Sequence, residues 1–265
     1  DDELLGRHPA ESFYGHVTNA IETVRRRPKN QIMVGCSRPE HKTHGYDLPM
    51  FVLETCMADQ PFIVDTIKMV LRRLDVRILG TLNMILPVKR NQDGSLVEIG
   101  PAAQSAPNES LTCHLLSSGT TTGREKEIEE AVHHHLTCAH AVVRDFRAMR
   151  RMVREVDGSL RFVAEGHPEH KETFDEVVAL GDWLIEDNFV FMGGYRFDAN
   201  FELTSQLGLG RIDTCTVETA PQTTMAPEAQ LVSISQTRID SPVHRDARLQ
   251  EIIVRLHDHD GEPAG

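Results

Sequence analysis

Asp59–Leu74 has the sequence DQPFIVDTIKMVLRRL, and the expected fold is built around it. Its apolar residues recur every three or four positions, which predicts a helix with one buried face. Asp59 is placed to act as the N-cap, and Pro61 falls in the first turn, where its missing N–H does little harm. The preceding Met50–Met57 is apolar and rich in β-compatible residues, so we expect a strand that leads directly into this helix.

On both sides of this strand and helix, the sequence alternates between helical and strand patterns. The Asn91–Gly94 stretch (NQDG) is a hairpin signal between two short apolar runs. The whole order, helix, β, β, α, β, β, β, α, predicts an α+β fold, a ferredoxin-like two-layer sandwich. The further elements that we expect are a helix over 11–27, strands over 31–36, 76–88, 96–99 and 111–117, and a long helix that begins at 123.

The long helix sets the predicted domain boundary. Its apolar residues keep helical spacing for more than thirty residues, which is longer than one small domain needs. We therefore expect it to bend or break near His133–Thr137 and to end the first domain, residues 1–157. A polar loop follows Gly158, and residues 158–265 are predicted to form a second, β-rich α+β domain that is truncated at its C-terminus. Its expected elements are a helix over 174–185 and strands over 188–197, 231–237 and 251–257.

The charge of the chain argues against two classes of partner. Lys and Arg number 28 and Asp and Glu number 40, which gives a net charge of −12. Nucleic acids and anionic membranes are repelled by such a chain on average. Apolar runs of the roughly 18–20 residues that span a bilayer are also missing. We therefore expect a cytoplasmic protein that binds neither nucleic acid nor membrane.

Two histidine-containing stretches are the candidates for an enzyme. In His133–His140, the i, i+4 spacing puts His134 and Cys138 on one helical face, where they could share a metal ion, but the stretch supplies no third ligand. His244 lies close to Asp240 and Ser241 in the sequence, as a hydrolase would require, although catalytic triads assemble from separate turns. We predict no catalytic residue and no metal ligand, and keep a metal-dependent or hydrolytic enzyme as an alternative.

Neither glycine-rich stretch matches a nucleotide-binding motif. Gly208-Leu209-Gly210 lacks the third glycine that a dinucleotide fingerprint requires. Gly119–Lys126 (GTTTGREK) lacks the spacing of a phosphate-binding loop and is typical of the capped start of a helix. We therefore expect no cofactor in this chain.

Several stretches together resemble one family. Asp59–Leu74 resembles the D-x-P-F-L-V-D-S-V-x-x-x-L helix of the very large NAD-dependent glutamate dehydrogenases of bacteria. Asp182–Phe197 (DWLIEDNFVFMGGYRF) is similar to their W-L-x-D-x-x-F-x-F-L-G-Y-R segment, with one extra glycine. Ser241–Arg245 (SPVHR) resembles their S-x-V-H-R. These matches occur in the same order over nearly the whole chain.

The resemblance implies a non-catalytic N-terminal segment of such an enzyme. In that family this region carries ACT-like modules, small βαββαβ units that bind amino-acid effectors or mediate subunit contacts. The implied partners are the rest of the parent chain, further copies in a homo-oligomer and an amino-acid effector. NAD and the oxidation of L-glutamate belong to the parent. A stand-alone amino-acid-sensing module is an alternative.

The resemblance also implies an effector site, at Asp59, Gln60, Pro61 and Phe62. Effector-binding ACT domains usually have D-x-P-G here, because glycine lets a small amino acid approach the backbone. Phe62 takes the place of that glycine. We therefore expect a pocket that is reshaped or filled from within, and a scaffold or subunit-interface role is the competing expectation.

Overall fold

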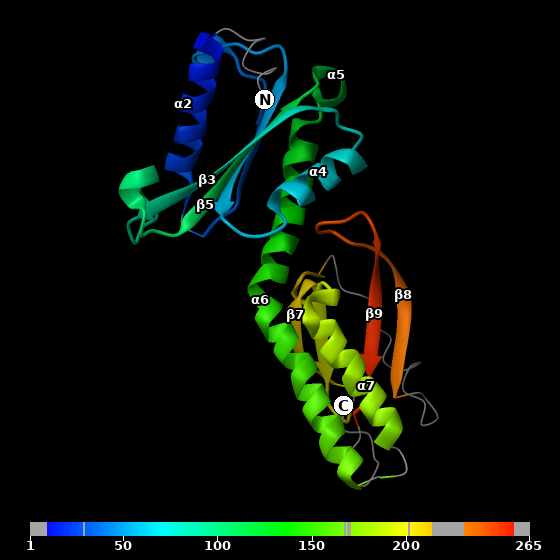
Figure 1. Cartoon of the computed structure of the whole chain (residues 1–265). Helices are drawn as coiled ribbons and strands as arrows, with labels where there is room; N and C mark the ends of the chain where they lie inside the picture. The colour runs from blue at the N-terminus through cyan, green and yellow to red at the C-terminus, as the bar shows by residue number, and fades with distance from the viewer. Residues whose placement is uncertain are drawn as a thin grey trace. The chain divides into compact units, whose positions relative to one another are not determined.

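The computed structural model describes residues 10–28, 30–166, 168, 171–200, 202–213 and 231–256. The chain forms two compact units (Figure 1). Unit 1 comprises Asp1–Ala139 and Val243–Arg245, and unit 2 comprises His140–Pro242 and Asp246–Gly265. The end of the last predicted strand lies outside the described residues.

Unit 1 is built on a five-stranded antiparallel sheet with the strand order β1-β2-β5-β3-β4. Its elements appear in the predicted order, and the α+β class is confirmed. The helices are α2 (Ala10–Arg26), α3 (His41–His44), α4 (Ile63–Arg73), α5 (Ser118–Thr121) and α6 (Glu125–Gly166), with a 3₁₀ turn, η1 (Gly100–Ala103). The strands are β1 (Met33–Ser37), β2 (Phe51–Ala58), β3 (Ile78–Arg90), β4 (Leu96–Ile99) and β5 (Asn108–Leu116).

The strand next to β2 differs from the βαββαβ pattern. In that pattern the strand beside the first one follows the second helix, whereas here β1 precedes β2 in the chain and pairs with it antiparallel. In the described residues, a helix and not a strand is the next element after α6 ends at Gly166. The edge of the sheet beside β2 is therefore formed by β1, from the N-terminal part of the chain.

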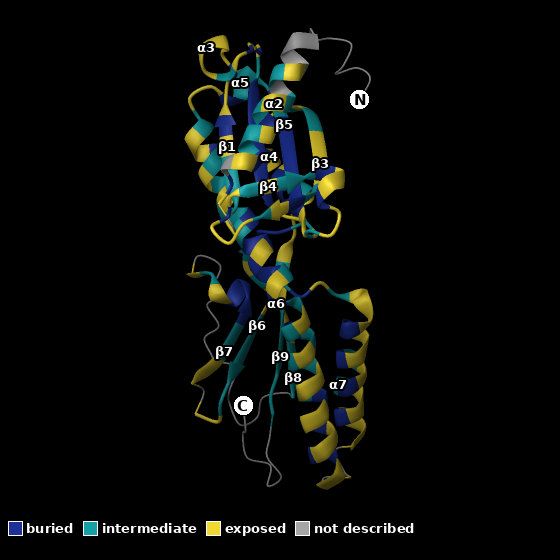
Figure 2. Cartoon of the chain, turned by 90° about the vertical axis from the view of Figure 1, so that its left-hand side faces the viewer, coloured by how far each residue is buried: buried dark blue, intermediate teal, exposed yellow. Residues whose placement is uncertain are grey.

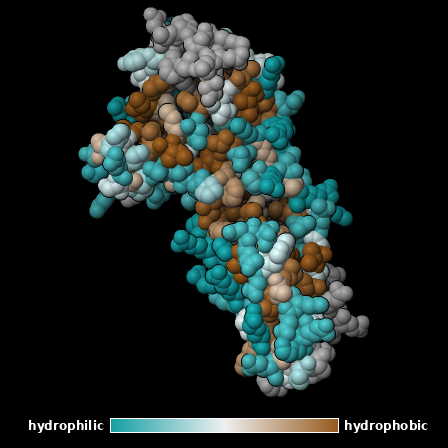
Figure 3. Space-filling model, in the orientation of Figure 1, coloured by the Kyte–Doolittle hydropathy of each residue, from teal (hydrophilic) through white to brown (hydrophobic). Residues whose placement is uncertain are grey.

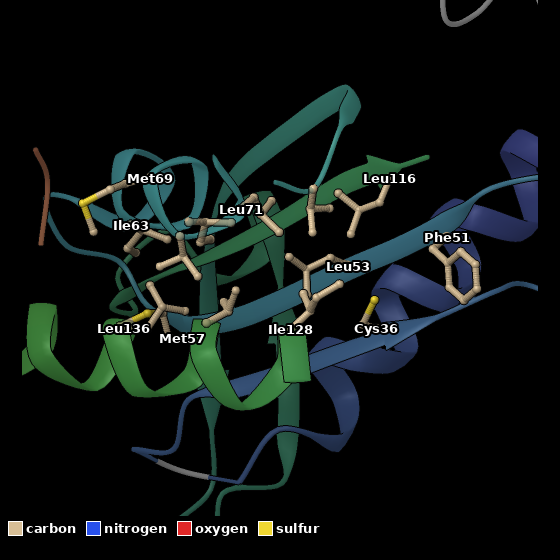
Figure 4. Close-up of a cluster of buried hydrophobic side chains, with 14 residues drawn as sticks. Cys36, Phe51, Leu53, Met57, Ile63, Met69, Leu71, Leu116, Ile128 and Leu136 are labelled. Carbon is tan, nitrogen blue, oxygen red and sulfur yellow. The ribbon is translucent and has the colours of Figure 1, made fainter. Parts of the chain in front are cut away.

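Both faces of the central strands are covered, which makes three layers where the sequence predicted two. On one face, Leu53 and Leu116 pack with residues of α4 and α6 such as Leu71 and Ile128 (Figure 4). On the other face, Ala20 and Val24 of α2 pack on the sheet. Seven consecutive residues of β2 are buried as a result. Its neighbour β5 is also mostly buried and is drawn largely in dark blue in Figure 2. Each fully buried aliphatic side chain contributes about 1.5–3 kcal/mol to folding.

A buried ion network fastens the end of α2 to the sheet. Arg90 donates two hydrogen bonds of 2.7 Å to the carboxylate of Glu109, and Arg27 donates a third, of 2.6 Å. Arg90 also donates to the carbonyl oxygen of Val24 at 2.8 Å. The side chains of both arginines are almost fully buried. The network needs its carboxylate, because two guanidinium groups would otherwise be buried without a counter-charge.

Helix α6 is longer than predicted. It runs unbroken through His133–Thr137 and through Gly158, so a break in the helix and the predicted polar loop after Gly158 are both wrong, while a bend stays a prediction. A single glycine costs a helix only about 1 kcal/mol, which packing of the remaining residues offsets. The compact units divide within this helix, after Ala139. A domain boundary at residue 157 stays a prediction.

Unit 2 combines the second part of α6 with α7 and two separate two-stranded sheets, β6-β7 and β8-β9. Gly181 lets α7 approach α6 closely, because a side chain there would collide with the carboxylate of Asp157. The predicted strand from Asn188 starts only at Gly193, and β7 was not predicted. The elements are α7 (Lys171–Trp183), η3 (Leu184–Asn188), β6 (Gly193–Phe197), β7 (Leu203–Gly208), η4 (Leu209–Arg211), β8 (Val232–Asp240) and β9 (Arg248–Val254).

Among the described helices, none is both long enough and apolar enough to cross a bilayer.

Candidate functional site

The loop Asp59–Phe62 connects β2 to α4, as predicted, but Asp59 is not the cap of the helix. The backbone N–H of Asp59 donates to the carbonyl oxygen of Asn108 at 3.0 Å, which continues the pairing of β2 with β5. The helix begins only at Ile63, so the N-cap position falls on Phe62, whose side chain makes no capping hydrogen bond. Asp59 and Pro61 are exposed, whereas Gln60 and Phe62 are partly covered.

Phe62 has the left-handed backbone conformation, with φ 75° and ψ 3°. This conformation is easy for glycine and rare for a bulky residue, in which it costs on the order of 1–3 kcal/mol. A glycine, as in D-x-P-G, would adopt this conformation without strain. The aromatic ring now occupies space that glycine would leave open.

The ring of Phe62 packs against a residue from far along the chain. Its centroid lies 4.8 Å from that of the His244 imidazole, with the planes tilted by 46°. The backbone N–H of His244 donates to the hydroxyl of Thr66 at 3.2 Å. Nδ1 of His244 lies 3.3 Å from a carboxylate oxygen of Asp65, in the first turn of α4. The start of α4 is thus held by a ring contact, a hydrogen bond and an electrostatic contact.

His244 is at the centre of a tight turn in the segment between β8 and β9. The backbone N–H of Arg245 donates to the carbonyl oxygen of Val243 at 2.8 Å, and His244 between them has φ 69°. A three-residue turn with a positive φ at its centre is rare and strained. Val243 is fully buried, and Arg245 Nε donates to His244 Nε2 at 3.1 Å. Val243–Arg245 are called the tip below.

The tip contacts one of the four residues where an amino-acid effector was predicted to bind, Phe62, while Asp59 and Pro61 stay exposed. Phe62 contacts His244 directly, and Asp65 and Thr66 are further contacts that sequence reasoning missed. The SPVHR motif was recognised, but nothing in its spacing indicates that it meets α4. Binding of an effector at Asp59–Phe62 stays a prediction.

The histidine stretch on α6 brings together fewer ligands than a metal site needs. Nε2 of His134 lies 3.8 Å from Sγ of Cys138, and the rings of His134 and His135 meet edge to face at 5.3 Å. Within the described part of the chain, no group of three or more His, Cys, Asp or Glu residues is arranged to hold a metal ion.

The hydrolytic candidate is arranged differently from a triad. The His244 ring faces Phe62 and Asp65, while the backbone N–H of Ser241 donates to the carbonyl oxygen of Ala247 at 2.7 Å.

The thiol of Cys56, in β2, is not activated as a nucleophile. Burial raises the pKa of the Cys56 thiol to about 12, and the Glu109 carboxylate adds to this effect. Such a thiol stays protonated at neutral pH and is a poor nucleophile.

The Gly208-Leu209-Gly210 stretch at the end of β7 does not have the structure of a dinucleotide-binding loop. Gly208 has φ 57°, and a side chain there would collide with the carbonyl oxygen of Met192. The short turn Leu209–Arg211 follows in place of a helix. The backbone of Gly208 is therefore packed against its own chain, and the backbone N–H that could meet a phosphate instead donates to Asp145 at 2.9 Å.

Comparison with known proteins identifies related chains. Residues 1–136 match the family described as the ACT1 domain of glutamate dehydrogenase. The chain is 26% identical over 279 residues to the NAD-specific glutamate dehydrogenase of Pseudomonas aeruginosa, which covers 98% of this chain. It is 22% identical over 284 residues to the NAD-specific glutamate dehydrogenase of Halomonas elongata, covering 99% of this chain. The chain spans only 17% of the length of each of these curated relatives.

Proposed function

Since the chain belongs to the family of the glutamate dehydrogenase ACT1 domain, we propose that it is a non-catalytic regulatory and oligomerisation segment from the N-terminal region of a large NAD-dependent glutamate dehydrogenase. The parent would convert L-glutamate, NAD and water to 2-oxoglutarate, ammonia and NADH. Both curated relatives carry the name NAD-specific glutamate dehydrogenase, and this chain corresponds to a small part of each. The parent would act in the cytoplasm.

One observation carries the non-catalytic role. Phe62, in the loop from β2 to α4 where an ACT-like unit would receive a ligand, contacts the tip from the SPVHR segment of the same chain. This contact between two family-like stretches supports a structural role for them in place of a catalytic one. The sheet of unit 1 is antiparallel throughout, whereas dinucleotide sites of dehydrogenases lie on parallel sheets.

NAD would accordingly bind in the parent and not in this chain. The backbone of Gly208 is packed against Met192, and in the described residues the short turn Leu209–Arg211 follows it where a dinucleotide site would need a helix N-terminus. The described residues around Gly208 therefore do not fit the cofactor.

The open edge of β3 supports an oligomerisation role. Ile78–Pro87 pair with β5 on one side, and in the described residues β4 pairs with the other side only from Val88 onward. This stretch, ILGTLNMILP, has no charged residue. In the orientation of Figure 1, hydrophobic residues gather on the face of unit 1 that β3 crosses (Figure 3). Long uncharged edge strands readily pair with another chain.

The exposed apolar residues of this edge are suited to a second copy of the same chain. Leu79, Leu82 and Ile85 are 46%, 40% and 52% exposed. Antiparallel pairing about a two-fold axis at Leu82 would set Leu79 of each copy opposite Ile85 of the other. A two-fold interface requires such self-complementarity.

Two measurements on the purified chain test the proposal. Glutamate-dependent formation of NADH, followed by absorbance with an intact glutamate dehydrogenase as the positive control, is expected to be absent. Light scattering is expected to show a mass above that of the monomer. Turnover by the chain alone would contradict the non-catalytic role, and a strictly monomeric chain would contradict the oligomerisation role.

Amino-acid sensing is the second candidate function, because Phe62, at the glycine position of D-x-P-G, has a left-handed backbone conformation that favours glycine. The midpoint of thermal unfolding would be measured with each of the twenty amino acids at millimolar concentration. Ligands that bind only the folded state raise this midpoint. If no amino acid shifts it, the chain acts as a scaffold. Stoichiometric zinc or hydrolase turnover would instead support the enzyme alternatives at His133–His140 or His244.

A further inference from the structure

The part of α6 that belongs to unit 2 exposes three arginines, Arg147, Arg151 and Arg154. They follow one another at intervals of four and three residues, so they lie along one side of the helix, and they are called the arginine stripe below. Among the described residues, none of the three side chains has an ion pair or a hydrogen-bond partner. Like charges at this spacing repel each other and destabilise a helix. A partner with negative charge would remove this repulsion.

The dipole of α6 does not account for the arginine stripe. A helix dipole stabilises basic residues only in the last turn, and α6 continues well beyond Arg154, to Gly166. The stripe also differs from its surroundings. Arg161 of the same helix pairs with Asp182 of α7, and in unit 2 Asp and Glu clearly outnumber Lys and Arg. The stripe is therefore an uncompensated basic surface on an acidic unit.

The exposed side of α7 has the opposite charge. Glu172 and Glu176 are exposed and about one helical turn apart, and neither side chain has a partner among the described residues. These two residues are called the glutamate pair below. Trp183, the only tryptophan of the chain, follows Glu176 by about two turns on the same side and is 50% exposed. In Figure 2, exposed residues line one side of α7 and buried residues the other.

We propose that the arginine stripe of one copy of the chain binds the glutamate pair of a second copy. Arg147 and Arg151 have the same spacing as the glutamate pair, about 6 Å along a helix axis, so two ion pairs can form at once. Trp183 adds apolar surface and a ring face on which a guanidinium group can stack. The proposal rests on the oligomerisation role proposed above, and it adds a contact in unit 2 to the edge of β3 in unit 1.

The response to salt separates this contact from the edge of β3. Exposed ion pairs are screened by salt, so the helix contact should weaken as the Debye length falls from about 10 Å at 0.1 M salt to about 3 Å at 1 M. The β3 stretch has no charged residue, and copies with a net charge of −12 repel each other. Association through that edge should therefore strengthen over the same range of salt concentration.

The fluorescence of Trp183 reports on the helix contact directly. The concentration of the whole chain is varied at about 0.05 M salt, where screening is weak. As copies associate, the indole ring leaves water, and its emission should shift to shorter wavelength. The chain concentration at the midpoint of this shift measures the affinity of the contact. At about 1 M salt this midpoint should lie at least about fivefold higher.

Arg151→Glu and Glu176→Arg test the pairing of the two surfaces. Each substitution sets like charges opposite each other, and each should raise the midpoint concentration at least about fivefold. The double variant exchanges the two charges and has the net charge of the wild type, so its midpoint should return toward the wild-type value. Arg238→Glu is the matched control, because it changes the net charge as Arg151→Glu does, at an exposed residue of β8. It should associate nearly as the wild type does.

The outcomes distinguish this contact from the oligomerisation role as a whole. If Trp183 emission does not change with chain concentration while light scattering still shows oligomers, the helix contact is overturned and oligomerisation through the edge of β3 stands. A chain that is monomeric at every salt concentration would overturn both. Wild-type midpoints in both single variants would overturn the contact. A double variant that associates no better than the single variants would also overturn it, because the stripe would then face a different partner.

Discussion

The rings of Phe62 and His244 lie 4.8 Å apart, and each residue has a positive φ, 75° for Phe62 and 69° for His244. Phe62 belongs to the loop that precedes α4, and His244 to the segment between β8 and β9. Two stretches that resemble one family in sequence are thus in contact in space. In this contact, a residue from a distant part of the same chain lies against the start of α4.

Gly208→Ala should destabilise unit 2 by at least about 2 kcal/mol. Gly208 has φ 57° and ψ −126°, a region open only to glycine, and its new methyl group would collide with the carbonyl oxygen of Met192. Gly35→Ala is the control, because open space surrounds that position. It should change the free energy of unfolding by less than about 0.5 kcal/mol. Urea unfolding measures both variants, and equal losses would contradict the prediction.

Glu109→Gln should destabilise unit 1 by about 3–5 kcal/mol, because it leaves Arg27 and Arg90 buried without a counter-charge. Glu98→Gln removes a carboxylate that pairs with Lys89 at 3.2 Å on the surface, and it should cost less than about 1 kcal/mol. The comparison uses chemical unfolding at neutral pH. A loss of under about 1 kcal/mol for Glu109→Gln would show that the network is not buried as described.

The contribution of Asp157 to the free energy of unfolding should become less favourable as the pH rises. Burial raises the pKa of its carboxyl from 3.8 to about 6, and the nearby Asp182 adds to this effect. Between these two values the folded state holds a proton that the unfolded state has released, so stability falls as the pH rises through this window. Above it the penalty is constant, on the order of 2–3 kcal/mol.

Asp157→Asn removes that penalty, and it should stabilise the protein at pH near 8 but barely at pH near 4. The measured quantity is the difference in the free energy of unfolding between the variant and the wild type. This difference is needed because His114 changes stability with pH in the opposite direction and is present in both proteins. Burial and Lys68 lower the pKa of His114 to about 4, so this residue contributes stability that is lost as the pH falls from about 6.5 to 4. A difference that does not change with pH would contradict the prediction for Asp157.

Leu82→Lys should weaken self-association through the edge of β3 by at least about tenfold, because two lysines would face each other at the two-fold axis. Tyr14→Lys places the same charge at a residue of α2 that is 76% exposed. Sedimentation equilibrium should show a loss of oligomer for Leu82→Lys alone. If both variants associate like the wild type, the edge of β3 is not the interface.

Local patterns in the sequence predicted most of unit 1, since its elements are encoded by periodicity and turn residues. The apolar spacing of α4 and the Asn91–Gly94 turn are examples, and both elements are present, although α4 begins later than its predicted N-cap, Asp59, implied. The order of elements along the chain also predicted the α+β class. The sequence did not predict that α2 forms a third layer, because the pattern of an amphipathic helix does not indicate which face of a sheet the helix covers.

The site was harder to predict, because its parts are distant in the chain. Phe62 was recognised as a departure from glycine, but its positive φ depends on a β2 strand that extends to Ala58 and delays the helix to Ile63. The contact with His244 depends on tertiary packing, for which no spacing rule exists. Likewise, α6 continues through Gly158 because packing overrides the weak helix propensity of one residue.

A double-mutant cycle on Phe62 and His244 tests the central claim most directly. Phe62→Leu keeps a side chain in the strained position but removes the ring, and His244→Asn removes its partner; Phe62→Leu with Tyr14→Leu is the control pair. The free energies of unfolding should show a coupling of about 1 kcal/mol for Phe62 and His244 and none beyond error for the control. A coupling for Phe62 and His244 below about 0.3 kcal/mol would contradict the account, because the start of α4 would then not be closed by this contact.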